Sequence, residues 1–290
     1  MSYYTALALE KEPFSTSPDP AFFFHSLAHR TALQRLEIAV RLRRGLSLIL
    51  GDVGTGKTTL SRTLLQTFHG EDHFLFHMIL DPTYKTEFQF LSQLVRMFGV
   101  RPAFRSTLDY KDAIERFLFQ KGVEENRTIV LLIDEGQKLS TPFLEILRTL
   151  LNYETNEYKL LQLIIFGQME LLPRLRKIKN FLDRISLKYI INPLDEHETK
   201  QMIEFRLTQA GFSATNRGAR LPVGQGSASG GNLNGSLFTD EAVHLIYERT
   251  QGYPRRIAIL CHDALEMLVM ENRKTVDVDL VRTLIQNEVA

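Results

Sequence analysis

A run of nine residues, 51–59, has the types and spacing of a phosphate-binding loop. It fits the pattern of Gly, four residues, Gly, Lys and then Ser or Thr, and it reads Gly51, Asp52, Val53, Gly54, Thr55, Gly56, Lys57, Thr58 and Thr59. The glycines let successive backbone N–H groups turn toward anionic oxygens, and the helix that follows adds the positive end of its dipole. In this pattern Lys57 reaches the β- and γ-phosphates and the Thr58 hydroxyl binds Mg²⁺. The run therefore predicts a site for the phosphates of a nucleotide and a magnesium ion.

Two adjacent carboxylates, Asp134 and Glu135, directly follow the apolar run 129–133. Ligands of open α/β sheets bind at the carboxyl ends of the strands, and two like charges there are costly unless a cation or a reaction uses them. We expect Asp134 to hold Mg²⁺ through water and Glu135 to orient the water that attacks the phosphorus in phosphoryl transfer. Together with residues 51–59, the carboxylates predict ATP and Mg²⁺ as cofactors and hydrolysis of ATP to ADP and phosphate.

The elements that must position these residues follow from the hydrophobic pattern. From Gly45 to Ile191, short apolar runs alternate with longer amphipathic segments, which favours a parallel sheet with crossover helices. Strands are expected at 46–50, 74–80, 129–133, 160–166 and 187–191. Helices are expected at 59–68, 88–98, 110–120, 143–153 and 170–183.

After Pro193 the pattern predicts helices alone, at 195–209, 240–250, 255–271 and 277–287. The expected fold class is α/β, with a P-loop core built on a three-layer parallel sheet and followed by a small all-helical lid domain. We expect an N-terminal segment with a first helix over 1–44, the α/β domain over 45–193 and the helical domain over 194–290. Residues 213–237 are rich in Gly, Ser and Asn and predict either a flexible insertion or a dedicated binding loop.

Composition sets further bounds on the function. The net charge is +1, so no bulk attraction to nucleic acid or membrane is expected, while a local basic patch stays open. The single cysteine, Cys261, excludes an intramolecular disulfide, and the histidines lack ligand spacing, so we expect no metal other than Mg²⁺. No apolar run approaches the ~20 residues of a membrane-spanning helix. With no secretion signal at the N-terminus, the sequence predicts a cytoplasmic protein.

The two nucleotide motifs and several other segments carry a family resemblance. The motifs resemble those of the AAA+ ATPases, and the whole set resembles the general secretion pathway protein A family, also called ExeA-like, and its relatives in pilus biogenesis. The segments span most of the chain and are Glu12-Pro13-Phe14, Pro18-Asp19-Pro20, Gly51 to Thr59, Leu131 to Gln137, Gly167-Gln168 with Glu170-Leu171, Leu237-Phe238-Thr239 with Ala242, and Gly252 to Arg256. Proteins of this family continue past the ATPase region with a membrane span and a peptidoglycan-binding region, which have no counterpart in the sequence to Ala290.

The resemblance implies roles for four further groups. Gln168 stands where the family has its first sensor, able to contact the γ-phosphate or the attacking water; on its own it also fits an ordinary loop residue. Arg255 resembles the second sensor, which binds the nucleotide from the helical domain, with Arg256 as the second choice. An arginine supplied by the neighbouring subunit completes such sites, and among Arg174, Arg176 and Arg184 the family pattern favours Arg184, although solvated basic residues explain them equally well. The N-terminal segment resembles the part that covers the adenine.

The resemblance implies a homo-oligomer, a ring or a filament, that couples ATP turnover to assembly of an envelope secretion or pilus machine. Its protein partner would lie at the inner membrane, and the chain would be cytoplasmic or peripheral there. The alternative is a DNA-associated AAA+ regulator resembling the transposition ATPases. Net charge does not distinguish between these two functions. A scaffold that binds ATP without hydrolysing it is disfavoured by the presence of Glu135.

Overall fold

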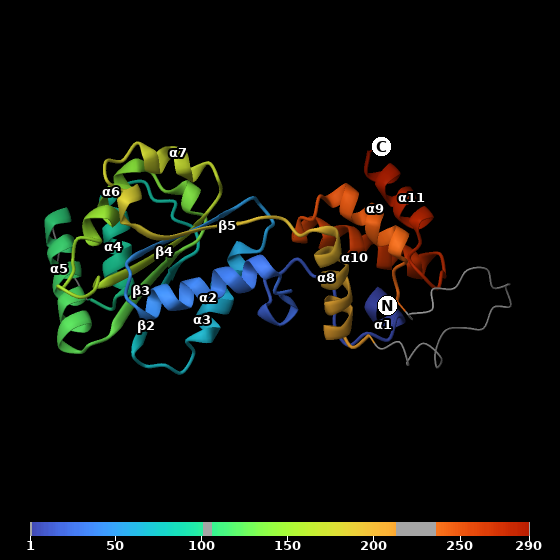
Figure 1. The fold of residues 1–290 in the computed structure, drawn as a ribbon, viewed down its shortest axis with the longest axis horizontal. Helices are drawn as coiled ribbons and strands as arrows, with labels where there is room; N and C mark the ends of the chain where they lie inside the picture. The colour runs from blue at the N-terminus through green and yellow to red at the C-terminus, as the bar shows by residue number, and fades with distance from the viewer. Residues whose placement is uncertain (1, 101–105, 213–235, 290) are drawn as a thin grey trace. The chain divides into compact units, whose positions relative to one another are not determined.

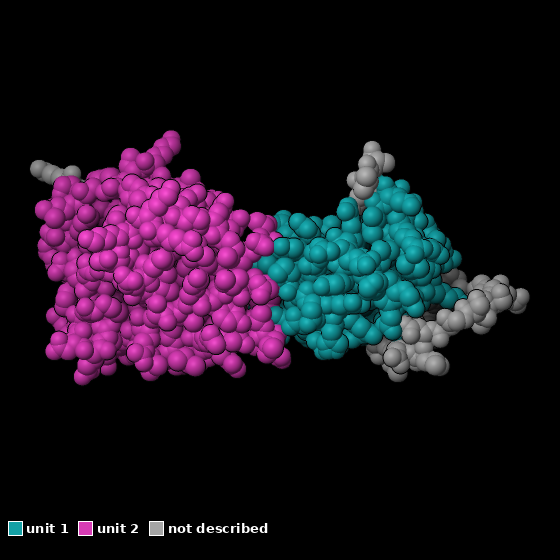
Figure 2. Space-filling view, turned by 45° about the horizontal axis from the view of Figure 1, so that its top comes forward, with its two compact units in different colours: residues 1–26, 54–56, 193–290 teal, residues 27–53, 57–192 magenta. Residues whose placement is uncertain are grey.

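The computed structural model describes residues 2–100, 106–212 and 236–289, and the chain divides into two compact units (Figure 2). Unit 1 comprises residues 1–26, 54–56 and 193–290, and unit 2 comprises residues 27–53 and 57–192. Of the insertion expected at 213–237, residues 213–235 lie outside the described residues, while Leu237 is buried in the core of unit 1. Within the described part of the chain, no helix combines the length and apolar character that crossing a membrane requires.

Unit 2 is built on a five-stranded parallel sheet with the strand order β2-β3-β4-β1-β5 (Figure 1). The strands are β1 (Leu46–Gly51), β2 (Phe74–Ile79), β3 (Thr128–Ile133), β4 (Leu161–Gly167) and β5 (Ile185–Ile191). Every residue of β1, β3 and β4 is buried, as expected of apolar runs covered on both faces. The parallel sheet is therefore confirmed, and its order places the end of β4 between the ends of β3 and β1, from which the two chemical motifs leave.

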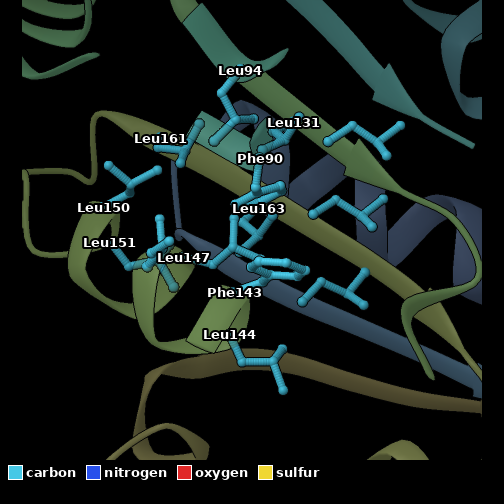
Figure 3. Packing of buried hydrophobic residues seen from close by; sticks show 14 of the residues in the cluster. Phe90, Leu94, Leu131, Phe143, Leu144, Leu147, Leu150, Leu151, Leu161 and Leu163 are labelled. Carbon is cyan, nitrogen blue, oxygen red and sulfur yellow. The ribbon is translucent and has the colours of Figure 1, made fainter. Parts of the chain in front are cut away.

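Helices cover the sheet of unit 2 on both faces (Figure 1). They are α2 (Leu27–Arg41), α3 (Lys57–Thr67), α4 (Glu87–Met97), α5 (Thr107–Phe119), α6 (Thr141–Leu150) and α7 (Leu171–Arg176). Alternate residues of β1, β3 and β4 join α4, α5 and α6 in the main core, as the two-residue period of a strand requires. Figure 3 shows Leu131 and Leu163 of the strands packed with Phe90 of α4 and Phe143 of α6, whose rings stack 5.1 Å apart.

One expected helix, 170–183, is shorter in the structure. Helix α7 ends at Arg176, and the N–H groups of Lys177 and Ile178 donate to carbonyls three residues earlier, each at 3.1 Å, in the tighter geometry of a helix end. Asn180 then takes a left-handed conformation with φ of 59°, which α-helices do not contain. A separate short helix, η4 (Leu182–Arg184), leads into β5. The prediction of one continuous helix was wrong.

The regular elements among the described residues of unit 1 are helices, and a parallel bridge pairs Phe238 with Val276. Its elements are α1 (Tyr3–Ala6), η1 (Pro20–Phe22), α8 (Glu196–Gln209), α9 (Asp240–Thr250), α10 (Pro254–Met270) and α11 (Val278–Val289). Asp195 and Thr239 cap α8 and α9, each accepting a backbone N–H from the first turn. The N-terminal segment belongs to this core, because the buried ring of Phe14 meets that of Phe238 edge-on at 6.1 Å. The expected helical part after the α/β core is therefore confirmed.

Candidate nucleotide-binding and catalytic site

The loop 51–59 joins the end of β1 to the start of α3, the arrangement that its sequence pattern predicts. Gly54 and Gly56 have φ angles of 84° and 92°, a conformation that side chains with a Cβ rarely adopt. Residues 54–56 group with unit 1, where the backbone N–H of Arg255 donates to the carbonyl of Gly54 at 3.3 Å. The two glycines therefore allow the loop backbone to adopt these positive φ angles. The residues on either side of 54–56 belong to unit 2.

Lys57 is held inside this loop by main-chain oxygens. Its side chain is buried, with 7% of the residue exposed, and Nζ donates to the carbonyls of Gly51 at 2.9 Å and Asp52 at 2.8 Å. Burial lowers the pKa of Lys57, and nearby carboxylates, Glu135 foremost, oppose that shift. The carbonyl contacts hold the amine at the loop, at the start of α3, where the phosphate-binding pattern requires it.

Thr58 and Asp134 bring the two motifs into direct contact. The Thr58 hydroxyl donates to Oδ2 of Asp134 at 2.6 Å, and Oδ1 of the same carboxylate accepts the backbone N–H of Glu135 at 2.9 Å. Asp134 is 3% exposed. A hydroxyl and a carboxylate oxygen this close form the hard oxygen donor set that Mg²⁺ prefers, so the residues present fit the expected cation.

Glu135 turns away from the strand that precedes it. Its φ of 52° places it in the left-handed region, and the short helix η3 (Gly136–Lys138) follows. Nε2 of Gln137 donates to Oε2 of Glu135 at 2.5 Å, and Oε1 of Gln137 accepts the backbone N–H of Gln168 at 3.1 Å. Sequence reasoning missed Gln137, because its two partners become neighbours only when β3 and β4 pair.

Gln168 follows β4 at the middle of the site. Leu50 of β1 pairs with Gly167, and Ile133 of β3 pairs with Ile165, so Gln168 leaves the sheet between the two motifs. The residue is half-buried. The structure thus brings Lys57, Thr58, Asp134, Glu135 and Gln168 to one edge of the sheet of unit 2.

The three arginines considered for a neighbouring subunit's site have different surroundings. Nη1 of Arg174 donates to the carbonyls of Gln137 at 2.5 Å and Leu139 at 3.2 Å, and Nη1 of Arg184 donates to that of Arg148 at 2.6 Å. Arg176 is exposed, and its side chain makes no hydrogen bond or ion pair with another described residue.

Of the two arginines expected to act from the helical domain, one is engaged by a neighbouring ring. In unit 1, the guanidinium of Arg256 lies 4.7 Å from the centre of the Tyr253 ring, a cation–π contact. Arg255 is exposed, and its side chain packs beside Gly54, where an added Cβ would lie 3.0 Å from that of Arg255. Neither contact involves unit 2.

Solved structures show where this fold occurs. The chain is similar to the ORC2 protein of Aeropyrum pernix, with a TM-score of 0.63 and 15% identity over 96% of this chain and 71% of the other. It is similar to Drosophila ORC bound to DNA, with a TM-score of 0.65 and 18% identity over 96% of this chain and 65% of the other. For the RuvB Holliday junction branch migration motor of Thermotoga maritima, the values are 0.56 and 15% over 92% and 72%. At these identities the likeness concerns the fold alone.

Sequence comparison indicates the protein family. A family model described as an AAA domain matches residues 40–175, which include the loop 51–59 and the two carboxylates. General secretion pathway protein A of Aeromonas hydrophila is 32% identical over 272 residues, which cover 91% of this chain and 44% of that protein. The chain thus spans less than half the length of this relative. The expected resemblance is confirmed: the family model and this relative support an ExeA-like AAA+ ATPase similar to general secretion pathway protein A.

Proposed function

We propose that the protein binds ATP with Mg²⁺ and hydrolyses it to ADP and phosphate. The observation that carries this proposal is the 2.6 Å contact between the Thr58 hydroxyl and Asp134, with the carboxylate of Glu135 next in the chain. A phosphate-binding loop that meets two carboxylates at the end of a parallel strand is the arrangement that phosphoryl transfer to water uses. The AAA domain match and the similarity to general secretion pathway protein A support the same reaction.

Each residue of this edge has a distinct proposed task. Mg²⁺, held by Thr58 and Asp134, would supply positive charge to the β- and γ-phosphate oxygens. Lys57 binds the same phosphates through its ammonium group. Glu135 orients the water that attacks the γ-phosphorus, and ADP departs with its charge stabilised by these cations. Gln168 hydrogen-bonds the γ-phosphate or the water, and Arg255 remains a predicted nucleotide ligand.

A direct test compares nucleotide binding with turnover. Lys57→Ala should abolish ATP binding in calorimetry, whereas Glu135→Gln should bind ATP and lose hydrolysis of it. Lys121→Ala is the matched control, because Lys121 pairs with Glu125 before β3, at the opposite end of that strand. Wild-type ATP affinity in the Lys57 variant, or wild-type phosphate release in the Glu135 variant, refutes the assigned roles.

We propose further that the active site is shared between subunits of a ring or filament. The family pattern makes Arg184 the first candidate for the arginine supplied in trans, and the exposed Arg176 is the second. Arg174 donates to two carbonyls of its own chain and Arg184 to one. Such an arginine contributes about 10³-fold or more in rate. Arg184→Ala mixed with Lys57→Ala should therefore recover part of the activity, since each variant supplies what the other lacks. Activity per subunit that is independent of protein concentration, with no recovery in the mixture, contradicts the shared site.

The proposed role is to couple ATP turnover to assembly of an envelope secretion or pilus machine, with a protein partner at the inner membrane and the chain on its cytoplasmic side. Its support is the similarity to general secretion pathway protein A. The DNA-associated alternative is not favoured, because the DNA-bound neighbour is only 18% identical and shares the fold alone. Purifying Glu135→Gln with ATP and identifying what accompanies it separates the two: envelope proteins support the proposal, and nucleic acid refutes it.

A further inference from the structure

The side chain of Gln137 bridges two segments of the proposed active site. It is 6% exposed, and both ends of its amide are used: Nε2 donates to Oε2 of Glu135 at 2.5 Å, and Oε1 accepts the N–H of Gln168 at 3.1 Å. One partner follows β3 and the other follows β4, so the amide joins the carboxylate to the backbone of the neighbouring strand end.

The backbone that carries this amide is itself fixed. Arg174 donates to the carbonyls of Gln137 and Leu139, on either side of the end of η3. Gly136 packs so closely on β4 that an added Cβ would overlap the side chain of Ile165. Because the main chain before and after Gln137 is anchored, its side chain is presented to Glu135 and Gln168 in a defined position.

An amide side chain makes both contacts because it carries a donor and an acceptor. A carboxylate accepts hydrogen bonds but cannot donate one to another carboxylate, and an aliphatic chain does neither. A carboxylate group has two oxygens. Donation from Nε2 to one of them fixes the direction of the other, so the orientation of Glu135 depends on Gln137.

We propose that Gln137 is a positioning residue for hydrolysis. It orients the Glu135 carboxylate toward the attacking water, and its second hydrogen bond couples that orientation to the main chain of Gln168. This inference rests on the proposed ATPase function. Gln137 itself touches neither nucleotide nor water in this scheme. Misplacement of a reacting group by about 1 Å costs up to about a hundredfold in rate, and this sets the scale of the expected effect.

Two variants separate the two hydrogen bonds, and a third serves as control. Gln137→Ala removes both bonds, whereas Gln137→Glu keeps an acceptor for the N–H of Gln168 and loses the donor to Glu135. The control is Gln162→Ala: Gln162 is also buried on β4, but its amide bonds the N–H of Gly45 and the carbonyl of Lys159, each at 2.7 Å, at the other end of the strand.

Single-turnover hydrolysis with saturating ATP, together with ATP affinity, is the first measurement. Both Gln137 variants should lose about 10- to 100-fold in rate with unchanged ATP affinity. Gln162→Ala should keep its rate even where its thermal unfolding shows lost stability. A wild-type rate in Gln137→Ala, or a loss in Gln137→Ala that Gln137→Glu does not share, overturns the proposal.

A double-mutant cycle tests whether Gln137 acts through Glu135, because a merely structural effect of Gln137→Ala would be the same with and without the Glu135 carboxylate. In the Glu135→Gln background, Gln137→Ala should cause no further loss of the residual single-turnover rate, because the carboxylate that Gln137 positions is already absent. Equal fold-losses in both backgrounds overturn the proposal. The proposed function fails separately: a wild-type protein without Mg²⁺-dependent hydrolysis refutes it, whereas an active wild type, a strongly slowed Glu135→Gln and a fully active Gln137→Ala refute this inference alone.

Discussion

Truncating Phe14 to Ala should destabilise unit 1 and leave unit 2 intact. Phe14 is 1% exposed, one of the largest fully buried side chains, and its ring meets that of Phe238 in the core of helices α8 to α11. Phe→Ala in a core costs about 3–5 kcal/mol, the sum of lost burial and the cavity left behind. Since each kcal/mol lowers the unfolding temperature of a domain by roughly 2–8 °C, we expect a drop of roughly 6 °C or more for unit 1.

Hydrogen exchange followed by mass spectrometry separates the two units in this experiment. Peptides from α9, α10 and α11 should lose protection in Phe14→Ala, while peptides from β3 and β4 should keep theirs. Met270→Ala is the control, because Met270 ends α10 and is 81% exposed. An unfolding temperature like that of the control, with unchanged protection in unit 1, would show that residues 1–26 are not part of its core.

Two other predictions concern unit 2. Thr58→Val should remove the Mg²⁺-dependent part of ATP affinity and Thr58→Ser should keep it, because only the serine retains the hydroxyl that contacts Asp134. Titrations of ATP with and without a chelator check this prediction. Equal Mg²⁺ dependence in the two variants contradicts it. Burial lowers the pKa of His77 below its ordinary 6.5, so the unfolded chain binds a proton that the folded one does not. Stability measured by denaturant titration should therefore fall as pH drops below 6.5 and level off above it, and His77→Phe should lose this dependence; an unchanged pH profile in that variant would rule out His77 as its source.

The sheet was predictable because its central strands are short apolar runs buried on both faces. The start of β1 at Leu46 and the ends of β3 at Ile133 and β5 at Ile191 were predicted to the residue. The same runs predicted where the chemical groups leave the sheet, since both motifs directly follow a buried strand. Periodicity overestimated the helix after β4, because no pattern of apolar residues signals the left-handed Asn180 that closes that region.

Contacts between segments that are distant in the sequence could not be predicted from the sequence pattern. Nothing in the spacing of residues 1–26 indicates that Phe14 packs on Phe238, and the amide of Gln137 looks like any polar residue after a strand. Both contacts depend on which elements become neighbours, a property of the whole fold. The roles of Arg176 and Arg184 depend on a second subunit and stay predictions for the same reason.

Asp134 and Glu135 carry the same charge, yet their surroundings suit them to different tasks. Both oxygens of Asp134 accept hydrogen bonds from its own chain, from the Thr58 hydroxyl and the next backbone N–H, so this carboxylate is fixed beside the hydroxyl with which it would hold a hard cation. In a continuing strand the next side chain would point to the opposite face of the sheet. The left-handed turn at Glu135 ends the strand instead, and the amide of Gln137 donates a hydrogen bond to one oxygen of the Glu135 carboxylate. A half-buried carboxylate held by one oxygen retains the other for a water, which is the property that a water-orienting group needs.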